Sequence, residues 1–122
     1  MNPIPFLAEH RALNAAAVAA YMGLIFLGSS MSGTGVPSTF GHYVSLLHIP
    51  EYAVLSALVY PLFMGKRHPL PLAIFICVLY GISDEMHQSF VPGRDTSPLD
   101  IIYDGVGATL GALLSRRWGG SR

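Results

Sequence analysis

One stretch of the chain, "DEMHQSFVPGRDTSPLD" at positions 84 to 100, gathers side chains that could do chemistry. Carboxylates beside an imidazole can transfer protons as general acids and bases, and they can ligate a divalent metal through oxygen and nitrogen atoms. An arginine among them can hold a phosphate or a carboxylate with two parallel hydrogen bonds. The ionisable residues of the stretch are Asp84, Glu85, His87, Arg94, Asp95 and Asp100.

A second group of such side chains lies upstream, in the stretch "HIPEY" that begins at His48. Residues three or four apart on a helix share a face, so His48 is predicted to lie beside Glu51 and Tyr52. The same rule predicts contact between Asp84 and His87. These spacings indicate one polar face on each of two helices.

Two further pairs follow the same spacing. Glu85 and Gln88 are three residues apart, and Asp100 and Asp104 are four residues apart.

Pro50 is predicted to kink its helix and to free backbone carbonyls, because proline lacks an N–H and clashes with the preceding turn. These groups can form one site only if the helices that carry them bring them together.

The segments around these groups are apolar. The chain is 52% hydrophobic and only 11% charged, whereas a soluble domain carries about 25% charged residues. A helix that spans a bilayer needs about 20 mostly apolar residues. The chain is therefore predicted to be an all-α, integral membrane bundle of four transmembrane helices, in a single domain over 1–122. The helices are expected at about 13–30, 43–64, 70–90 and 98–114.

The basic residues indicate how this bundle is oriented, because they stay preferentially on the cytoplasmic side of a membrane. With four spans, one side receives all of them except Arg94, so both termini are predicted to be cytoplasmic. The residues on that side are Arg11, Lys66, Arg67, Arg116, Arg117 and Arg122. Every acid except Glu9 lies towards the opposite, outer side.

The acids and histidines are therefore predicted to line one outward-facing pocket. Helix two runs away from the outer side and helix three runs towards it, which places their polar residues at the same depth. The residues expected to carry acid–base chemistry are Asp84, Glu85, His87, His48 and Glu51. Those expected to bind a substrate are Arg94, Gln88, Tyr52 and Asp100, with Asp104 at the edge of the pocket.

The residue types leave three interpretations of this pocket open. It could bind a divalent metal through nitrogen and oxygen ligands. It could transfer protons, because a low dielectric and a neighbouring histidine can tune a carboxyl group. It could also be structural, with hydrogen bonds that lock the helices together. The candidate metal ligands are His48, Glu51, Asp84 and His87.

Other features narrow the range of functions. The formal net charge is zero, which gives no basis for nucleic-acid binding. Cys77 is the single cysteine, so the chain can form no internal disulfide and no CxxC metal site. Gly105, Gly107 and Gly111 are interpreted as small residues that let helices pack closely.

The order and spacing of these motifs resemble the VanZ-like family of membrane proteins. The resemblance rests on "YGISDEMHQSFVPGRDTSPLDIIYDGVGATLGALL" and "HIPEYAVL", and it covers about 43–114. The chain departs from the family at Asp104, where members often have Asn. The matching positions are His48, Glu51, Tyr52, Asp84, Glu85, His87, Gln88, Pro92, Gly93, Arg94 and Asp100.

The resemblance implies a protein of the bacterial cytoplasmic membrane, because the family is named for an accessory protein of resistance to glycopeptide antibiotics, associated with teicoplanin. The implied partners are the lipid bilayer and a lipid-linked or phosphate-bearing envelope molecule, or a lipoglycopeptide. An enzyme, a non-catalytic binding or modulatory protein and a small transporter subunit all stay open. A transporter needs a polar path to the cytoplasmic side, and the inner halves of the four segments look apolar.

Overall fold

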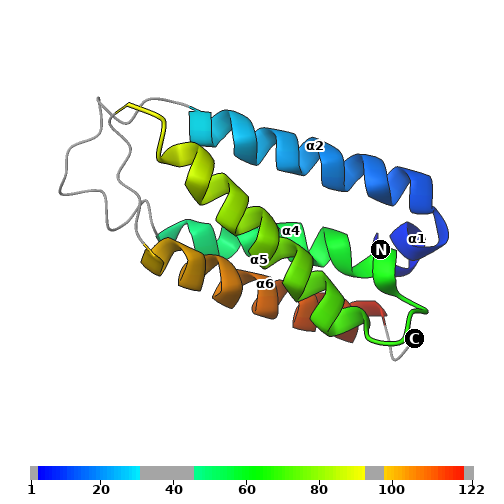
Figure 1. The fold of residues 1–122 in the computed structure, drawn as a ribbon. Helices are drawn as coiled ribbons and strands as arrows, with labels where there is room; N and C mark the ends of the chain where they lie inside the picture. Colours follow the sequence, from blue (N-terminus) through cyan, green and yellow to red (C-terminus); the bar gives the residue numbers. More distant parts are fainter. Residues whose placement is uncertain (1–2, 31–45, 93–97, 120–122) are drawn as a thin grey trace.

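The computed structural model describes residues 3–30, 46–92 and 98–119 of the 122-residue chain. Within these ranges the fold is all-α, as predicted, with five helices and no strand (Figure 1). The four longer helices lie side by side, and short α1 packs at one end of the bundle. The helices are α1 (Pro3–Glu9), α2 (Arg11–Ser30), α4 (His48–Phe63), α5 (Pro69–Gln88) and α6 (Pro98–Gly119).

The boundaries of the helices differ from the predicted ones at both ends of the chain. Helix α1 forms over Pro3–Glu9, where the sequence predicts none. Helix α6 continues to Gly119 instead of ending near position 114. Arg116 and Arg117 lie in its last turn, where positive charge favours the helix because the carbonyl end of its dipole is negative.

Pro50 does not kink its helix, so that prediction is wrong. Helix α4 begins at His48, with Leu47 at the N-cap, which places Pro50 in the first turn. The N–H groups of a first turn have no acceptor within the helix, so a proline there removes no helical hydrogen bond. The carbonyls near His48 are therefore not freed by Pro50.

Helix α4 is tied to its neighbours through its own backbone carbonyls. Pro61 lies inside the helix, and its missing N–H leaves the carbonyl of Ala57 without its helical partner. Ser115 of α6 donates its hydroxyl to this carbonyl at 3.1 Å. At the C-terminal end of α4, the Arg11 guanidinium donates to two carbonyls, including that of Met64 at 2.8 Å. These bonds fix α4 at the centre of the bundle.

Helices α4 and α6 approach each other closely through glycines. A Cβ atom at Gly107 would overlap the backbone carbonyl of Ile49, and one at Gly111 would overlap that of Ala53. A Cβ at Gly105 would instead meet only a side chain of α5, at 3.9 Å. The predicted close packing is confirmed for Gly107 and Gly111, and Gly105 lies outside that contact.

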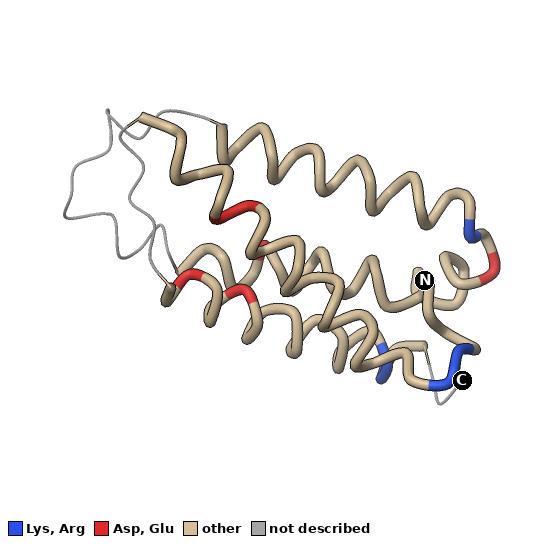
Figure 2. The backbone as a smooth tube through the Cα atoms, in the orientation of Figure 1, with Lys and Arg blue, Asp and Glu red and all other residues tan. Residues whose placement is uncertain are grey.

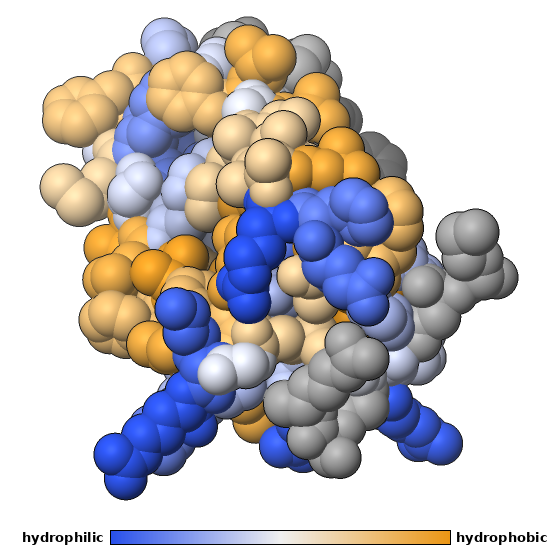
Figure 3. Space-filling model, turned by 90° about the vertical axis from the view of Figure 1, so that its right-hand side faces the viewer, coloured by the Kyte–Doolittle hydropathy of each residue, from blue (hydrophilic) through white to orange (hydrophobic). Residues whose placement is uncertain are grey.

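The bundle turns apolar side chains outward and many polar ones inward. Large apolar side chains such as Leu24, Phe75 and Ile102 are 59% exposed or more. Figure 3 looks onto one end, where hydrophilic side chains project and apolar ones cover much of the surface beside them. Soluble monomers rarely expose large contiguous apolar patches, so this surface suits lipid better than water. The buried polar residues are Asn14, Ser29, His48, Ser56, Asp84, Gln88, Asp100, Asp104 and Ser115.

The charged residues separate towards the two ends of the bundle (Figure 2). One end, here called the basic end, carries the described lysines and arginines together with Glu9. The other described acids lie towards the opposite end, here called the acidic end: Glu51, Asp84, Glu85, Asp100 and Asp104. By length and composition, α2 and α5 are the described helices that could each cross a membrane.

Candidate functional site

Four helices bring polar side chains together at the acidic end. The last turns of α2 and α5 meet the first turns of α4 and α6 there, because successive long helices run in opposite directions (Figure 1). Each helix contributes at least one buried polar residue that is at most 7% exposed. These residues are Ser29 of α2, His48 of α4, Asp84 of α5 and Asp104 of α6.

His48 and Asp104 form a buried pair that joins α4 to α6. The Nδ1 atom of His48 lies 2.6 Å from the Oδ1 atom of Asp104. A carboxylate on one ring nitrogen fixes the orientation of an imidazole and leaves the other nitrogen to exchange protons. The pair therefore has the geometry of a positioned general acid or base.

Gly81 of α5 makes room for this pair. A Cβ atom at Gly81 would lie only 2.5 Å from the Oδ2 atom of Asp104. The carboxylate therefore rests against the backbone of α5 with one oxygen while its other oxygen faces His48. Any side chain at position 81 would compete with the carboxylate for this space.

Asp84 is the centre of a second hydrogen-bond network, which joins α2 to α5. Ser29 donates its hydroxyl to Oδ1 of Asp84 at 2.5 Å. The Gln88 amide donates to the Ser29 hydroxyl at 3.1 Å and to Oδ2 of Asp84 at 3.5 Å. All three residues are buried, so the network holds the two helix ends together in a non-aqueous setting.

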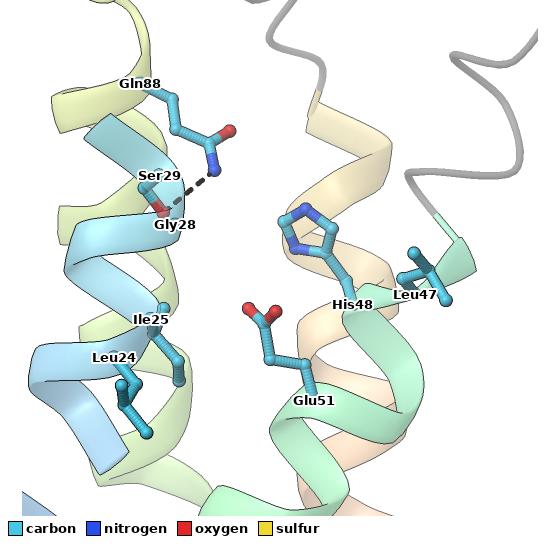
Figure 4. A pocket seen from close by; sticks show the side chains of 8 residues that line it. All are labelled: Leu24, Ile25, Gly28, Ser29, Leu47, His48, Glu51 and Gln88. Carbon is cyan, nitrogen blue, oxygen red and sulfur yellow. Dashed lines mark hydrogen bonds between the residues drawn. The ribbon is translucent and has the colours of Figure 1, made fainter. Parts of the chain in front are cut away.

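A cleft of about 200 Å³ opens between the two networks (Figure 4). Ser29 and Gln88 lie on one wall, and His48 and Glu51 lie on the other, with their side chains directed towards the gap. The cleft is thus polar where α2, α4 and α5 meet and apolar beside it. The remaining lining residues are Leu24, Ile25, Gly28 and Leu47.

The structure brings some of the predicted site residues to this cleft and places others around it. His48, Glu51 and Gln88 line the cleft, and Asp84 is bonded directly to its wall. Tyr52 lies one turn below, fully buried, with its ring 6.2 Å from that of His48. These five residues are the part of the predicted site that the structure gathers.

The bonded partners differ from the ones that helical spacing suggested. His48 bonds to Asp104 on another helix, and the hydrogen bonds of Asp84 reach across to α2. His87 is not one of the described residues that line the cleft. Its Nε2 atom lies 2.9 Å from the Ser30 hydroxyl, and its ring stacks on Phe26 at 4.4 Å.

Half-buried Glu85 and buried Asp100 lie near the pair of His48 and Asp104. Oε1 of Glu85, Oδ1 of Asp100 and Oδ2 of Asp104 are buried without a hydrogen-bond partner within the described ranges. Such atoms are uncommon in folded proteins and call for a water, an ion or a ligand. Arg94, the predicted anion-binding residue, lies outside the described residues, so that role stays a prediction.

The metal interpretation gains no support from the described side chains. Among residues 3–30, 46–92 and 98–119, no group of three or more His, Cys, Asp or Glu residues is placed to hold a metal ion. The hydrogen-bonded pair of His48 and Asp104 instead fits proton transfer.

Two residues of the site escaped the sequence analysis. Ser29 lies in the last turn of α2. The only indication in the sequence was that polar residues follow the apolar segment. Gly81 gave no signal at all, because its role depends on Asp104, which is distant in sequence and belongs to another helix. Asp104 itself was placed at the edge of the pocket, whereas it holds His48.

The profile of the VanZ/LLP1 family matches residues 14–119, a range that contains α4, α5 and α6 and almost all of α2. The chain belongs to the VanZ/LLP1 family. The resemblance seen in the motifs is therefore confirmed over most of the chain. The whole site of this VanZ/LLP1 protein, including Ser29 and Gly81, lies inside the matched range. Neither a curated protein nor a solved structure matches the chain.

Proposed function

We propose that the protein spans the bacterial cytoplasmic membrane four times, through α2, α4, α5 and α6. The outward-facing apolar side chains and the buried polar ones support this arrangement. Helix α4 has only 16 residues, or about 24 Å at 1.5 Å per residue, but it contacts every other described helix. A helix enclosed by protein needs less apolar surface than one surrounded by lipid.

The basic end is proposed to face the cytoplasm and the acidic end to face the outside, with both termini cytoplasmic. Lysine and arginine are retained on the cytoplasmic side of membrane proteins. Trp118, which is 52% exposed beside Arg116 and Arg117, suits an anchor at the inner water–lipid boundary. In this orientation the cleft opens towards the cell envelope.

The cleft is proposed to bind the polar head of an amphiphilic envelope molecule. One observation carries this proposal: polar groups of α2, α4 and α5 line a cleft whose remaining lining is apolar, and Asp104 of α6 holds one of them, His48. Leu24 and Leu47, both more than 60% exposed, would contact the apolar part of the ligand. Arg94 is the candidate partner for a phosphate, and lipid-linked molecules and lipoglycopeptides such as teicoplanin are the ligand classes that fit.

The cleft is further proposed to perform acid–base chemistry on that head group. His48 is held by Asp104 through Nδ1, which leaves Nε2 as the atom that can take or give a proton. Glu51 faces the same space (Figure 4). Two groups that exchange protons on one wall of the cleft can serve as a general acid and a general base.

The proposal is tested by binding of a polyprenyl phosphate to the purified full chain in detergent, followed by native mass spectrometry. Glu51→Gln removes a charge that faces the cleft and should change the affinity at least tenfold, which corresponds to about 1.4 kcal/mol. Glu9→Gln, at the basic end and exposed, is the matched control. Absence of binding, or equal binding by the wild type and Glu51→Gln, would reject the proposed site.

The same incubation separates an enzyme from a binding protein. Mass spectra of the recovered lipid report any chemical change. A product that forms with the wild type and is lost with His48→Gln supports catalysis, whereas binding with an unchanged lipid supports the non-catalytic alternative.

A further inference from the structure

Helix α4 carries a line of polar side chains through the middle of the bundle. His48, Tyr52, Ser56 and Tyr60 follow one another at four-residue intervals, and none is more than 7% exposed. Successive members lie about 6 Å apart along the helix axis, at 1.5 Å per residue. The line begins at the acidic end and reaches the basic end, where Tyr60 interacts electrostatically with Arg116.

Other helices add polar groups to the lower part of this line. Asn14 of α2 is fully buried and donates its amide to the carbonyl of Leu58 at 2.7 Å. Ser115 of α6 is also fully buried and donates to the carbonyl of Ala57. The inner half of the bundle is therefore not apolar inside, although the sequence of the segments suggested that it would be.

Three groups along the line hold buried atoms without a hydrogen-bond partner among the described residues. They are the Tyr52 hydroxyl, the Ser56 hydroxyl and the Oδ1 atom of Asn14. An unsatisfied buried polar atom costs about 1–3 kcal/mol, and in folded proteins such atoms are normally satisfied by internal water. No direct hydrogen bond joins Tyr52, Ser56 and Tyr60 among the described residues, so transfer between them requires bridging waters.

The upper part of the line touches the acidic groups of the site. Tyr52 interacts electrostatically with Asp104, Asp84, Glu51 and Tyr80. Protons that enter at the cleft would therefore reach the buried hydroxyls through carboxyl groups and the His48 ring, which exchange protons readily. Ionisable and hydroxyl groups inside a membrane protein commonly mark proton pathways.

We propose that this line, the α4 polar column of His48, Tyr52, Ser56 and Tyr60, conducts protons between the acidic and basic ends. Each hydroxyl accepts a proton on its oxygen and passes its own proton onward through a bridging water. At every step one bond to the proton forms and one breaks, an N–H bond at His48 and an O–H bond at each hydroxyl and water, so one proton crosses and no residue is changed. The driving force is the proton gradient across the bilayer.

This activity goes beyond ligand binding at the cleft. It requires that the bundle spans a membrane, but it does not require an amphiphilic ligand. It also supplies the polar path that a transporter needs. When both are measured on one preparation, ligand binding can therefore be observed without proton flux, and proton flux without ligand binding.

Proton flux is measured with the full chain in vesicles of phosphatidylethanolamine and phosphatidylglycerol that contain the pH dye pyranine. Valinomycin and potassium keep the membrane potential from opposing the flow. The wild type should equilibrate an imposed pH difference faster than protein-free vesicles. Tyr52→Phe and Ser56→Ala, which delete the two unsatisfied hydroxyls, should each lower the protein-dependent rate at least tenfold.

Two matched controls delete hydroxyls away from the column. Tyr103→Phe removes a hydroxyl from a half-buried tyrosine of α6. Thr109→Ala removes one that is exposed and bonds to the carbonyl of Gly105 in its own helix. Both variants should keep the wild-type rate.

Equal rates for wild-type and protein-free vesicles would overturn the proposal, and so would a wild-type rate in Tyr52→Phe. If Tyr52→Phe fails to fold, as judged by circular dichroism and gel filtration, Ser56→Ala decides by the same criterion. The Ser56 hydroxyl has only a weak described contact, with the buried Cys77 thiol, so its removal should leave the fold intact.

Discussion

At the scale of single residues, the site depends on partners that lie far apart in sequence. The imidazole of His48 is held by Asp104, and Asp84 is held by Ser29. The residue types near the cleft were predictable because acids and histidines are scarce in an apolar chain and therefore conspicuous. Their partners were not, because helical spacing relates residues within one helix and says nothing about side chains on another.

Gly81→Ala should disturb the site while leaving the bundle folded. The new methyl group would lie 2.5 Å from Oδ2 of Asp104, so the carboxylate must move away from His48. Gly23→Ala on α2, where a Cβ meets nothing within 4 Å, is the control. Nitrogen NMR of the histidine rings provides the measurement: the His48 Nδ1 resonance should shift in Gly81→Ala and stay in place in Gly23→Ala. An unmoved resonance in Gly81→Ala would mean that Gly81 does not position the pair.

At the scale of elements, α4 and α6 form the contact on which the site is built. Gly107 and Gly111 bring the two backbones close together, and Ser115 satisfies the carbonyl that Pro61 leaves open. This close approach also lets His48 near the start of α4 reach Asp104 near the start of α6. Small-residue spacing predicted that α6 packs closely, but it did not identify α4 as the partner.

Gly111→Ala should destabilise the bundle by about 1–3 kcal/mol, the usual cost of overpacking. Its Cβ would overlap a backbone carbonyl of α4, which cannot rotate away as a side chain could. Gly105→Ala is the matched control on the same helix, because its Cβ meets only a side-chain atom at 3.9 Å. Thermal unfolding in detergent should show a lower midpoint for Gly111→Ala alone. Equal midpoints for the two variants would show that the contact between α4 and α6 is looser than described.

At the scale of the whole molecule, large apolar side chains cover much of the outer surface, while several polar side chains are buried beside an apolar core. Opposite charges separate towards the two ends (Figures 2 and 3). α2 and α5 have the length and composition of membrane spans. α4 is shorter, with 16 residues, and α6 carries four charged residues, Asp100, Asp104, Arg116 and Arg117.

The proposed orientation is tested with two exposed positions at opposite ends of the bundle. Lys66→Cys and Ser89→Cys each introduce a thiol, and native Cys77 is fully buried, so it should contribute little background. A membrane-impermeant maleimide should label Ser89→Cys in intact cells and should reach Lys66→Cys only after the membrane is opened. Labelling of both variants in intact cells, or of Lys66→Cys alone, would contradict the orientation.

The sequence alone determined the all-α class, the approximate positions of the four long helices, the family and three of the residues that line the cleft, His48, Glu51 and Gln88. These follow from local quantities: apolar length, turn residues, and rare ionisable groups in an apolar chain. The tertiary structure decided which side chains pair, where the cleft opens and that α4 carries a buried polar column. Those features depend on how helices rotate against one another, and small contacts such as Gly81 with Asp104 and Gly111 with Ala53 fix that rotation.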